Sequence, residues 1–178
     1  MRPVTGLGQV QALAVIMPSL SRAYPHIDVR RIQLSSSVTP DALENDLICL
    51  GGVKNNLITD HLLTRLGPKL PFVLSPAAIE WRGNEPHRFT GEMSGGVVKR
   101  DCGVIVQTPN PFARDRQLVI LAGLHTYGTI AAARHFVHEY ARVSRWRDSN
   151  FAAVVETDVI DGYACRPEPA RFEELASS

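Results

Sequence analysis

The stretch LVILAGLHTYGTIAAARHF, from Leu118 to Phe136, joins a strand-like segment to a helix-like one and so decides how the fold is read. Leu118 to Ala122 is a short apolar run, and an alanine-rich segment typical of a helix extends from about residue 128 to 143. Around the junction, residues 123–129 contain two glycines, two threonines and a histidine, more than one turn and one helix cap require. The junction predicts a strand, a ligand-contacting loop and a helix.

Other apolar runs along the chain have the length of strands. The runs at residues 47–50, 72–74, 104–106 and 118–121 are predicted to be neighbouring strands, with Ile48 and Ile120 buried. The alternating segment HIDVRRIQL, residues 26–34, predicts a further strand, and helices are expected at about 8–24 and 57–66.

Strands that alternate with helices indicate right-handed crossovers and a parallel sheet with helices on both faces. We therefore expect a single α/β domain over residues 1–178, with a three-layer Rossmann-like fold and a mostly parallel sheet. An antiparallel β-hairpin insertion is expected at about 76–100, where a Gly-Asn-Glu-Pro turn separates two short strand-like runs. A loosely packed tail is expected at about 161–178.

Composition narrows the class of protein. The 178 residues are 44% hydrophobic and 21% charged, and the net charge of +1 argues against a nucleic-acid footprint. No apolar run approaches the length of about 18 residues needed to span a membrane, and the N-terminal apolar stretch is interrupted by glutamines, so a cytoplasmic protein is expected. The three cysteines lack metal-ligand spacing, so no metal site is expected; Cys49 and Cys102 are interpreted as buried packing residues. No cofactor can be named.

In open α/β sheets, ligands bind beyond the carboxyl ends of the strands. Two loops at such positions, GGVKNN and GLHTYGT, combine glycines with amide or hydroxyl side chains before a helix, where free N–H groups favour anions. The predicted ligand-binding residues are Gly51, Gly52, Lys54, Asn55, Asn56, Asn110, Gly123, His125, Thr126, Gly128 and Thr129.

A plainer interpretation of the second loop stays open, in which Thr126 caps the helix and the glycines serve the turn. The candidate catalytic residues are His125 and Glu92, each a possible acid or base. Asp101 and Glu80 are further carboxylates that face the site or, alternatively, only solvent. No named catalytic or phosphate-binding fingerprint accompanies them, so whether the chain is an enzyme is left undecided.

Two segments, RDCGVIVQTPNPF and LVILAGLHTYGTIAAAR, together with DLICLGGVKNN, resemble an uncharacterised group of bacterial Rossmann-like domains. Those domains are often joined to signalling or conflict-system modules. The similarity covers about Asp46 to Arg134. It implies ligand recognition more than a reaction, and possible partner signalling domains or subunits.

These observations favour a sensor-like domain that binds a nucleotide or another phosphorylated small molecule. The expected partner is this anionic ligand, with no nucleic acid and no membrane. A hydrolase acting on a nucleotide or its N-glycosidic bond is the alternative, and a protein-interaction module is a third. The substitution Gly128→Asp is expected to weaken ligand binding more than stability.

Overall fold

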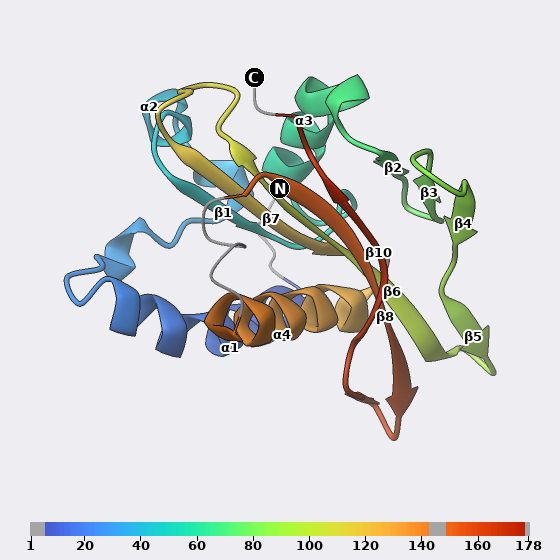
Figure 1. The fold of residues 1–178 in the computed structure, drawn as a ribbon. Helices are drawn as coiled ribbons and strands as arrows, with labels where there is room; N and C mark the ends of the chain where they lie inside the picture. Colours follow the sequence, from blue (N-terminus) through green and yellow to red (C-terminus); the bar gives the residue numbers. More distant parts are fainter. Residues whose placement is uncertain (1–5, 143–148, 177–178) are drawn as a thin grey trace.

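A computed structural model describes residues 6–142 and 149–176, which form a curled sheet with helices against both faces (Figure 1). The helices are α1 (Leu7–Ala23), α2 (Pro40–Leu43), α3 (Leu57–Leu66) and α4 (Thr126–Arg142). The strands are β1 (Leu47–Leu50), β2 (Phe72–Leu74), β3 (Ile79–Trp81), β4 (His87–Phe89), β5 (Glu92–Ser94), β6 (Val97–Pro109), β7 (Gln117–Gly123), β8 (Phe151–Ile160), β9 (Tyr163–Ala164) and β10 (Glu168–Glu174).

The main sheet has the strand order β1-β7-β6-β8-β10, with β5 and β9 added beside β6 and β8. Among the described strands, β1 and β7 are the one parallel pair; β6 runs antiparallel to both of its long neighbours, and β8 runs antiparallel to β10. The prediction of a mostly parallel, three-layer Rossmann-like sheet is therefore wrong.

The connection between β6 and β7 explains the error. Only residues 110–116 separate the two strands, and the Asn110 N–H donates to the Arg116 carbonyl oxygen at 2.7 Å. A parallel pair needs a crossover of about a dozen residues or more, so this short loop allows only an antiparallel pair. The apolar runs predict both strands correctly. No helix lies between them, however, and this absence indicates an antiparallel pair.

The strand β2 does not join the main sheet. It pairs with β3, and β3 pairs with β4, in a separate three-stranded antiparallel sheet. The hairpin formed by β3 and β4 lies within residues 76–100. Phe72 of β2 stacks on Trp81 of β3 with ring centroids 6.3 Å apart, so the small sheet has an apolar face to bury.

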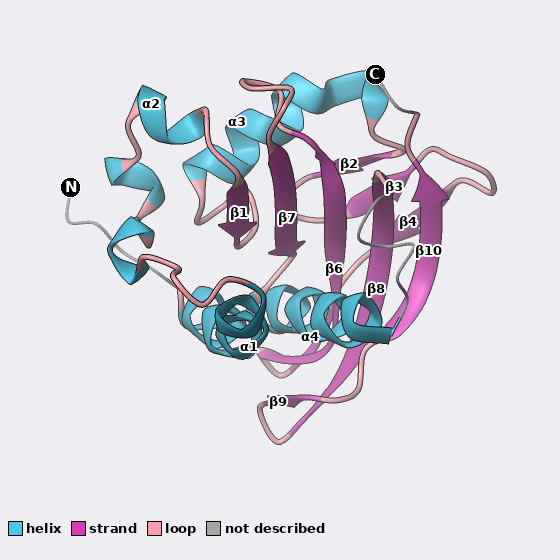
Figure 2. Cartoon of the chain, turned by 60° about the vertical axis from the view of Figure 1, so that its left-hand side comes forward, coloured by secondary structure: helices cyan, strands magenta, loops and turns pink. Residues whose placement is uncertain are grey.

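The helices α1 and α4 lie on one face of the main sheet (Figure 2), and an apolar cluster packs against each of its two faces. On one face, Ala12 and Ile16 of α1 and Ala131 to Ala133 of α4 pack on buried residues of β6, β7 and β8. On the other face, α3 and the small sheet contribute Leu62, Leu66 and Phe72. Packed elements cover both faces of β7, whereas β1 is an edge strand and is covered less completely.

The difference between β7 and β1 corrects a second prediction. Ile120 of β7 is fully buried, as predicted, whereas Ile48 of β1 is 40% exposed. The segment 26–34, predicted to be a strand, instead contains a 3-10 turn at Val29–Arg31, so no described strand pairs with the outer edge of β1. The tail after residue 161, for which no strand was predicted, contributes β9 and β10.

Candidate functional site

The two glycine-containing loops meet at one edge of the sheet. Because β1 and β7 are parallel, both strands end at that edge, and the loops 51–56 and 123–129 follow them directly. Gly52 lies against Gly123 so closely that a Cβ atom on Gly52 would overlap the carbonyl oxygen of Gly123. The rule for the carboxyl ends of parallel strands thus holds locally, for the single parallel pair.

The beginning of α1 completes this loop cluster. Gly8 packs on the backbone of Thr126, where a Cβ atom would come within 2.7 Å of the Thr126 oxygen. The three segments enclose a polar cleft with a volume of about 30 Å³. It is lined by Gly6, Gly8, Gln9, Gly51, Gly52, Lys54, Asn55, Gly123, Leu124, His125, Thr126 and Thr129.

The Gln9 side chain ties α1 to the loop after β1. Its Oε1 atom accepts a hydrogen bond from the Gly6 N–H at 2.5 Å. Its Nε2 atom donates to the carbonyl oxygens of Leu50 at 3.1 Å and Asn55 at 3.4 Å. Sequence reasoning did not include this residue in the site; the two glycines at positions 6 and 8, just where a helix begins, were the signal that could have found it.

Eight of the eleven predicted binding residues line the cleft, and the other three do not. Asn56 caps α3, accepting from the Ile58 and Thr59 N–H groups at 3.0 and 3.1 Å. Asn110 is fully buried, and its Nδ2 atom donates to the carbonyl oxygens of Leu43 and Asn45 at 2.7 Å. Both amides therefore hold loops in place.

Gly128 is the third predicted residue outside the cleft. It is buried, and a Cβ atom there would overlap the backbone of Cys102 on β6. The glycine allows the first turn of α4 to approach the sheet, not a ligand. The expectation that Gly128→Asp costs binding more than stability is revised, because any side chain at this position would push α4 away from β6.

A buried carboxylate, Asp101 of β6, organises the start of α4. Its Oδ2 atom accepts from the Gly128 N–H at 2.5 Å, and its Oδ1 atom accepts from the N–H groups of Cys102 at 2.9 Å and His125 at 3.3 Å. These donors compensate for removing the carboxylate from water. Asp101 therefore takes the capping role that we assigned to a threonine, and it is not a solvated strand residue.

The same carboxylate orients His125. The Nδ1 atom of His125 lies 3.2 Å from Asp101 Oδ1, and the imidazole is 31% exposed. The Nδ1 atom thus faces the carboxylate, and Nε2 is the ring nitrogen left for a ligand. The other catalytic candidate, Glu92, is exposed on β5 and does not line the cleft, although its neighbour Gly91 packs on the His125 ring.

The two buried cysteines do not act as nucleophiles. Burial raises the pKa of the Cys49 thiol to about 12. Burial, with the nearby Glu156 carboxylate, raises the pKa of Cys102 to about 12 as well. Both thiols are protonated at neutral pH, and thiolate is the nucleophilic form.

Comparisons with family models, curated proteins and solved structures return no match. Within residues 6–142 and 149–176, no group of three or more His, Cys, Asp or Glu side chains is arranged to hold a metal ion. No helix in that part of the chain is both long enough and apolar enough to cross a membrane. The loop cluster and its cleft are therefore the basis for any functional conclusion.

Proposed function

We propose that this chain is a cytoplasmic small-molecule-binding domain whose polar cleft receives the phosphate group of a nucleotide or another phosphorylated ligand. The observation that carries the proposal is the meeting of both predicted loops with the start of α1 in one cleft. Glycines at positions 6, 8, 51, 52 and 123 bring backbone close to any occupant. Partner signalling domains stay a prediction from the sequence resemblance.

Charge and size support an anionic group of limited extent. Lys54 lines the cleft, and in the described part of the chain it forms no ion pair, so its ammonium group is available to an anion. The helix α1 begins beside the cleft, and the N-terminal end of a helix favours negative charge, whereas the N-terminal end of α4 already holds the Asp101 carboxylate. A water needs about 10–15 Å³ of such volume, so about 30 Å³ holds two or three waters, and a phosphate would enter the cleft with part of its oxygens while the rest of the ligand lies outside.

Calorimetric titration with ribose 5-phosphate tests the proposal. Replacing Lys54 with alanine removes a charged partner, and the affinity should fall about tenfold, the equivalent of about 1.4 kcal/mol. Lys99→Ala is the matched control, because Lys99 is an exposed lysine on β6 that does not line the cleft. Equal affinities for the wild type and the Lys54→Ala variant would contradict a phosphate site here.

The His125–Asp101 pair favours a second candidate function, hydrolysis of a nucleotide or of its N-glycosidic bond. A carboxylate on Nδ1 and a partly exposed imidazole in a cleft suit a general base acting through Nε2. Incubation with nucleotides, followed by chromatography of the products, tests it. A hydrolase should release base or phosphate, and the His125→Ala variant should lose this activity. Intact nucleotides after prolonged incubation would contradict hydrolysis and leave ligand binding as the proposed function.

A further inference from the structure

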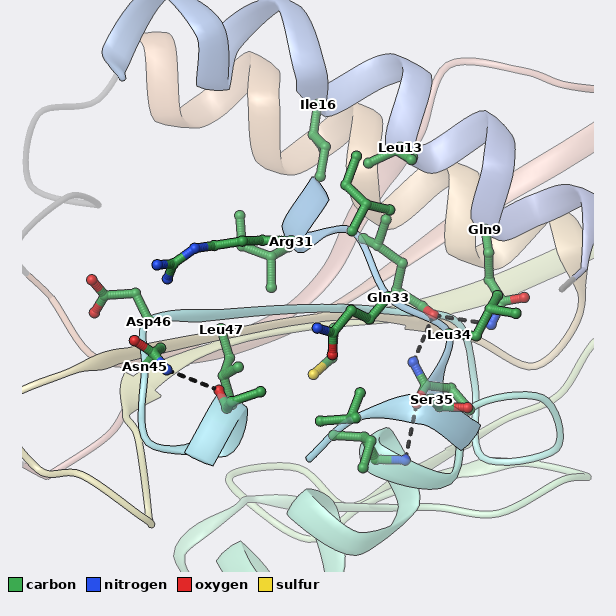
Figure 3. A pocket seen from close by; sticks show the side chains of 18 of the residues that line it. Gln9, Leu13, Ile16, Arg31, Gln33, Leu34, Ser35, Asn45, Asp46 and Leu47 are labelled. Atoms are coloured by element: carbon green, nitrogen blue, oxygen red, sulfur yellow. Dashed lines mark hydrogen bonds between the residues drawn. The ribbon is translucent and has the colours of Figure 1, made fainter. Parts of the chain in front are cut away.

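A larger apolar groove adjoins the polar cleft. It has a volume of about 770 Å³, within the range of about 300–1,000 Å³ typical of small-molecule sites. One wall is α1, with Val10, Leu13 and Met17; the opposite wall is the segment around Leu34, and β1 forms the floor (Figure 3). Gln9 and Asn55 line both the groove and the cleft, so the two spaces are neighbours.

The floor of the groove is the outer edge of β1, and it carries backbone hydrogen-bonding groups. The Gly51 N–H donates to the Leu121 carbonyl oxygen of β7 at 2.9 Å. Backbone groups alternate in direction along a strand, so Cys49 also faces β7, while Ile48 and Leu50 face the groove. The Leu50 carbonyl oxygen confirms this direction, because it accepts from Gln9 and from Asn56 on the groove side.

Among the described residues, the C=O of Ile48 and the N–H of Leu50 have no hydrogen-bond partner, which leaves an acceptor beside a donor on this edge. An alkyl chain in the groove would cover both groups without pairing them, at the full cost of their desolvation. A flat apolar ring with a donor and an acceptor on one edge would satisfy both. Both purines have such an edge: adenine places its N6 amino donor beside the N7 acceptor, and guanine places its N1–H donor beside the O6 acceptor.

We propose that the groove binds the purine base of a nucleoside monophosphate while oxygens of its phosphate enter the cleft. This inference rests on the proposed function, since it takes the cleft as the phosphate site. Gly51 is three residues beyond Ile48, a distance of about 10 Å at about 3.3 Å per residue. A nucleoside monophosphate has a similar length from the edge of its base to its phosphorus atom, so its phosphate would lie at the small cleft.

Four probes distinguish the groove from the cleft: AMP, GMP, adenosine and ribose 5-phosphate. We expect AMP to bind at least tenfold more tightly than ribose 5-phosphate, because it fills both spaces. GMP should also bind at least tenfold more tightly than ribose 5-phosphate, since the N1–H group of guanine can donate to the Ile48 carbonyl oxygen while O6 accepts from the Leu50 N–H. Adenosine should still bind, and the Lys54→Ala variant should bind it as tightly as the wild type does.

A groove-filling variant completes the experiment. Val10 is 50% exposed and lines the groove, so Val10→Trp should reduce AMP and adenosine affinity at least tenfold and leave ribose 5-phosphate affinity unchanged. Val97 of β6 is also 50% exposed but lies outside the groove, which makes Val97→Trp the matched control. Thermal melting of each variant checks the fold.

Each contrary result has its own meaning. Equal affinities for AMP and ribose 5-phosphate would overturn the groove as a base site and leave the phosphate cleft standing. GMP binding no more tightly than ribose 5-phosphate would overturn recognition of a purine base by the β1 edge. If adenosine binds as tightly as AMP, the phosphate contributes nothing. This result would overturn the cleft as a phosphate site and leave the groove as a base site. If ribose 5-phosphate binds but neither adenosine nor the base of AMP contributes, the edge serves another occupant, such as a peptide strand, and the inference fails.

Discussion

The two edges of β1 differ in almost every respect. Its inner edge pairs with β7, and the loop that follows packs glycine against backbone so closely that no Cβ atom fits at Gly52. Its outer edge has no strand partner among the described residues, and the apolar side chains around it, such as Ile48 and Val10, are about half exposed. The same four-residue strand thus holds a rigid loop cluster on one side and borders an open groove on the other. The closed side should tolerate few substitutions and the open side many.

The largest effect should separate Ile120 from Ile48, two isoleucines on neighbouring parallel strands. Ile120→Asp places an unpaired carboxylate in a fully buried position and should lower the free energy of unfolding by about 4 kcal/mol or more. Ile48→Asp leaves its carboxylate in contact with water and should cost about 1 kcal/mol or less. Urea denaturation of both variants measures the difference, and similar losses would contradict the contrast between the two edges.

Two glycines give a second comparison. Gly128 is needed for a close contact, and Gly95 for its backbone conformation. Gly128→Ala would place a Cβ atom on the Cys102 backbone and should cost about 2 kcal/mol or more, by analogy with overpacked cores. Gly95 has φ of +58° with nothing near its missing Cβ, so Gly95→Ala should cost about 1 kcal/mol, and Gly95→Asn less, because asparagine tolerates this conformation. A Gly128→Ala variant as stable as the wild type would mean that α4 does not need its close approach to β6.

A smaller effect should appear in the pH dependence of stability. Burial lowers the pKa of His135, which is 8% exposed on α4. As the pH falls below about 6.5, the usual value for histidine, the unfolded chain takes up this proton before the folded chain does. The stability that His135 provides in its neutral form is therefore complete above that pH and lost below it.

Urea denaturation at several pH values measures this effect. His135→Gln should reduce the loss of stability on acidification, while His26→Gln, at an exposed position, should follow the wild type. Identical pH profiles for the His135→Gln variant and the wild type would show that His135 is not the group responsible.

The sequence predicts the positions of most helices and strands, but not the order and direction of the strands in the sheet. The strand positions around Ile120 and the helix capped by Asn56 follow from local patterns of apolar residues and caps. The relative direction of two strands depends on the length of the connection between them, and the short loop after Pro109 indicates an antiparallel pair. The outer edge of β1 is open because residues 26–34 do not form a strand, although the alternation of apolar residues in this segment predicts one.

The candidate site was predicted as two loops, and the structure adds what those loops contact. Lys54 and His125 were identified by residue type and by position after a strand. Asp101 was named as one carboxylate among several, because its burial and its bond to His125 arise from residues 24 positions apart. Gln9 and Gly8 contribute through contacts between α1 and segments more than 40 residues away, which no local pattern contains.

Amide NMR spectra recorded during titration with AMP and with ribose 5-phosphate test the central claim most directly. The account predicts that the amides of Gly52, Lys54 and Gly123 shift with both ligands, because both place a phosphate in the cleft. The amides of Ile48 and Leu50 should shift with AMP alone, because only AMP has a base for the groove. Shifts confined to other surfaces, or no shifts at all at millimolar ligand, would contradict the claim that this edge of the sheet is the binding site.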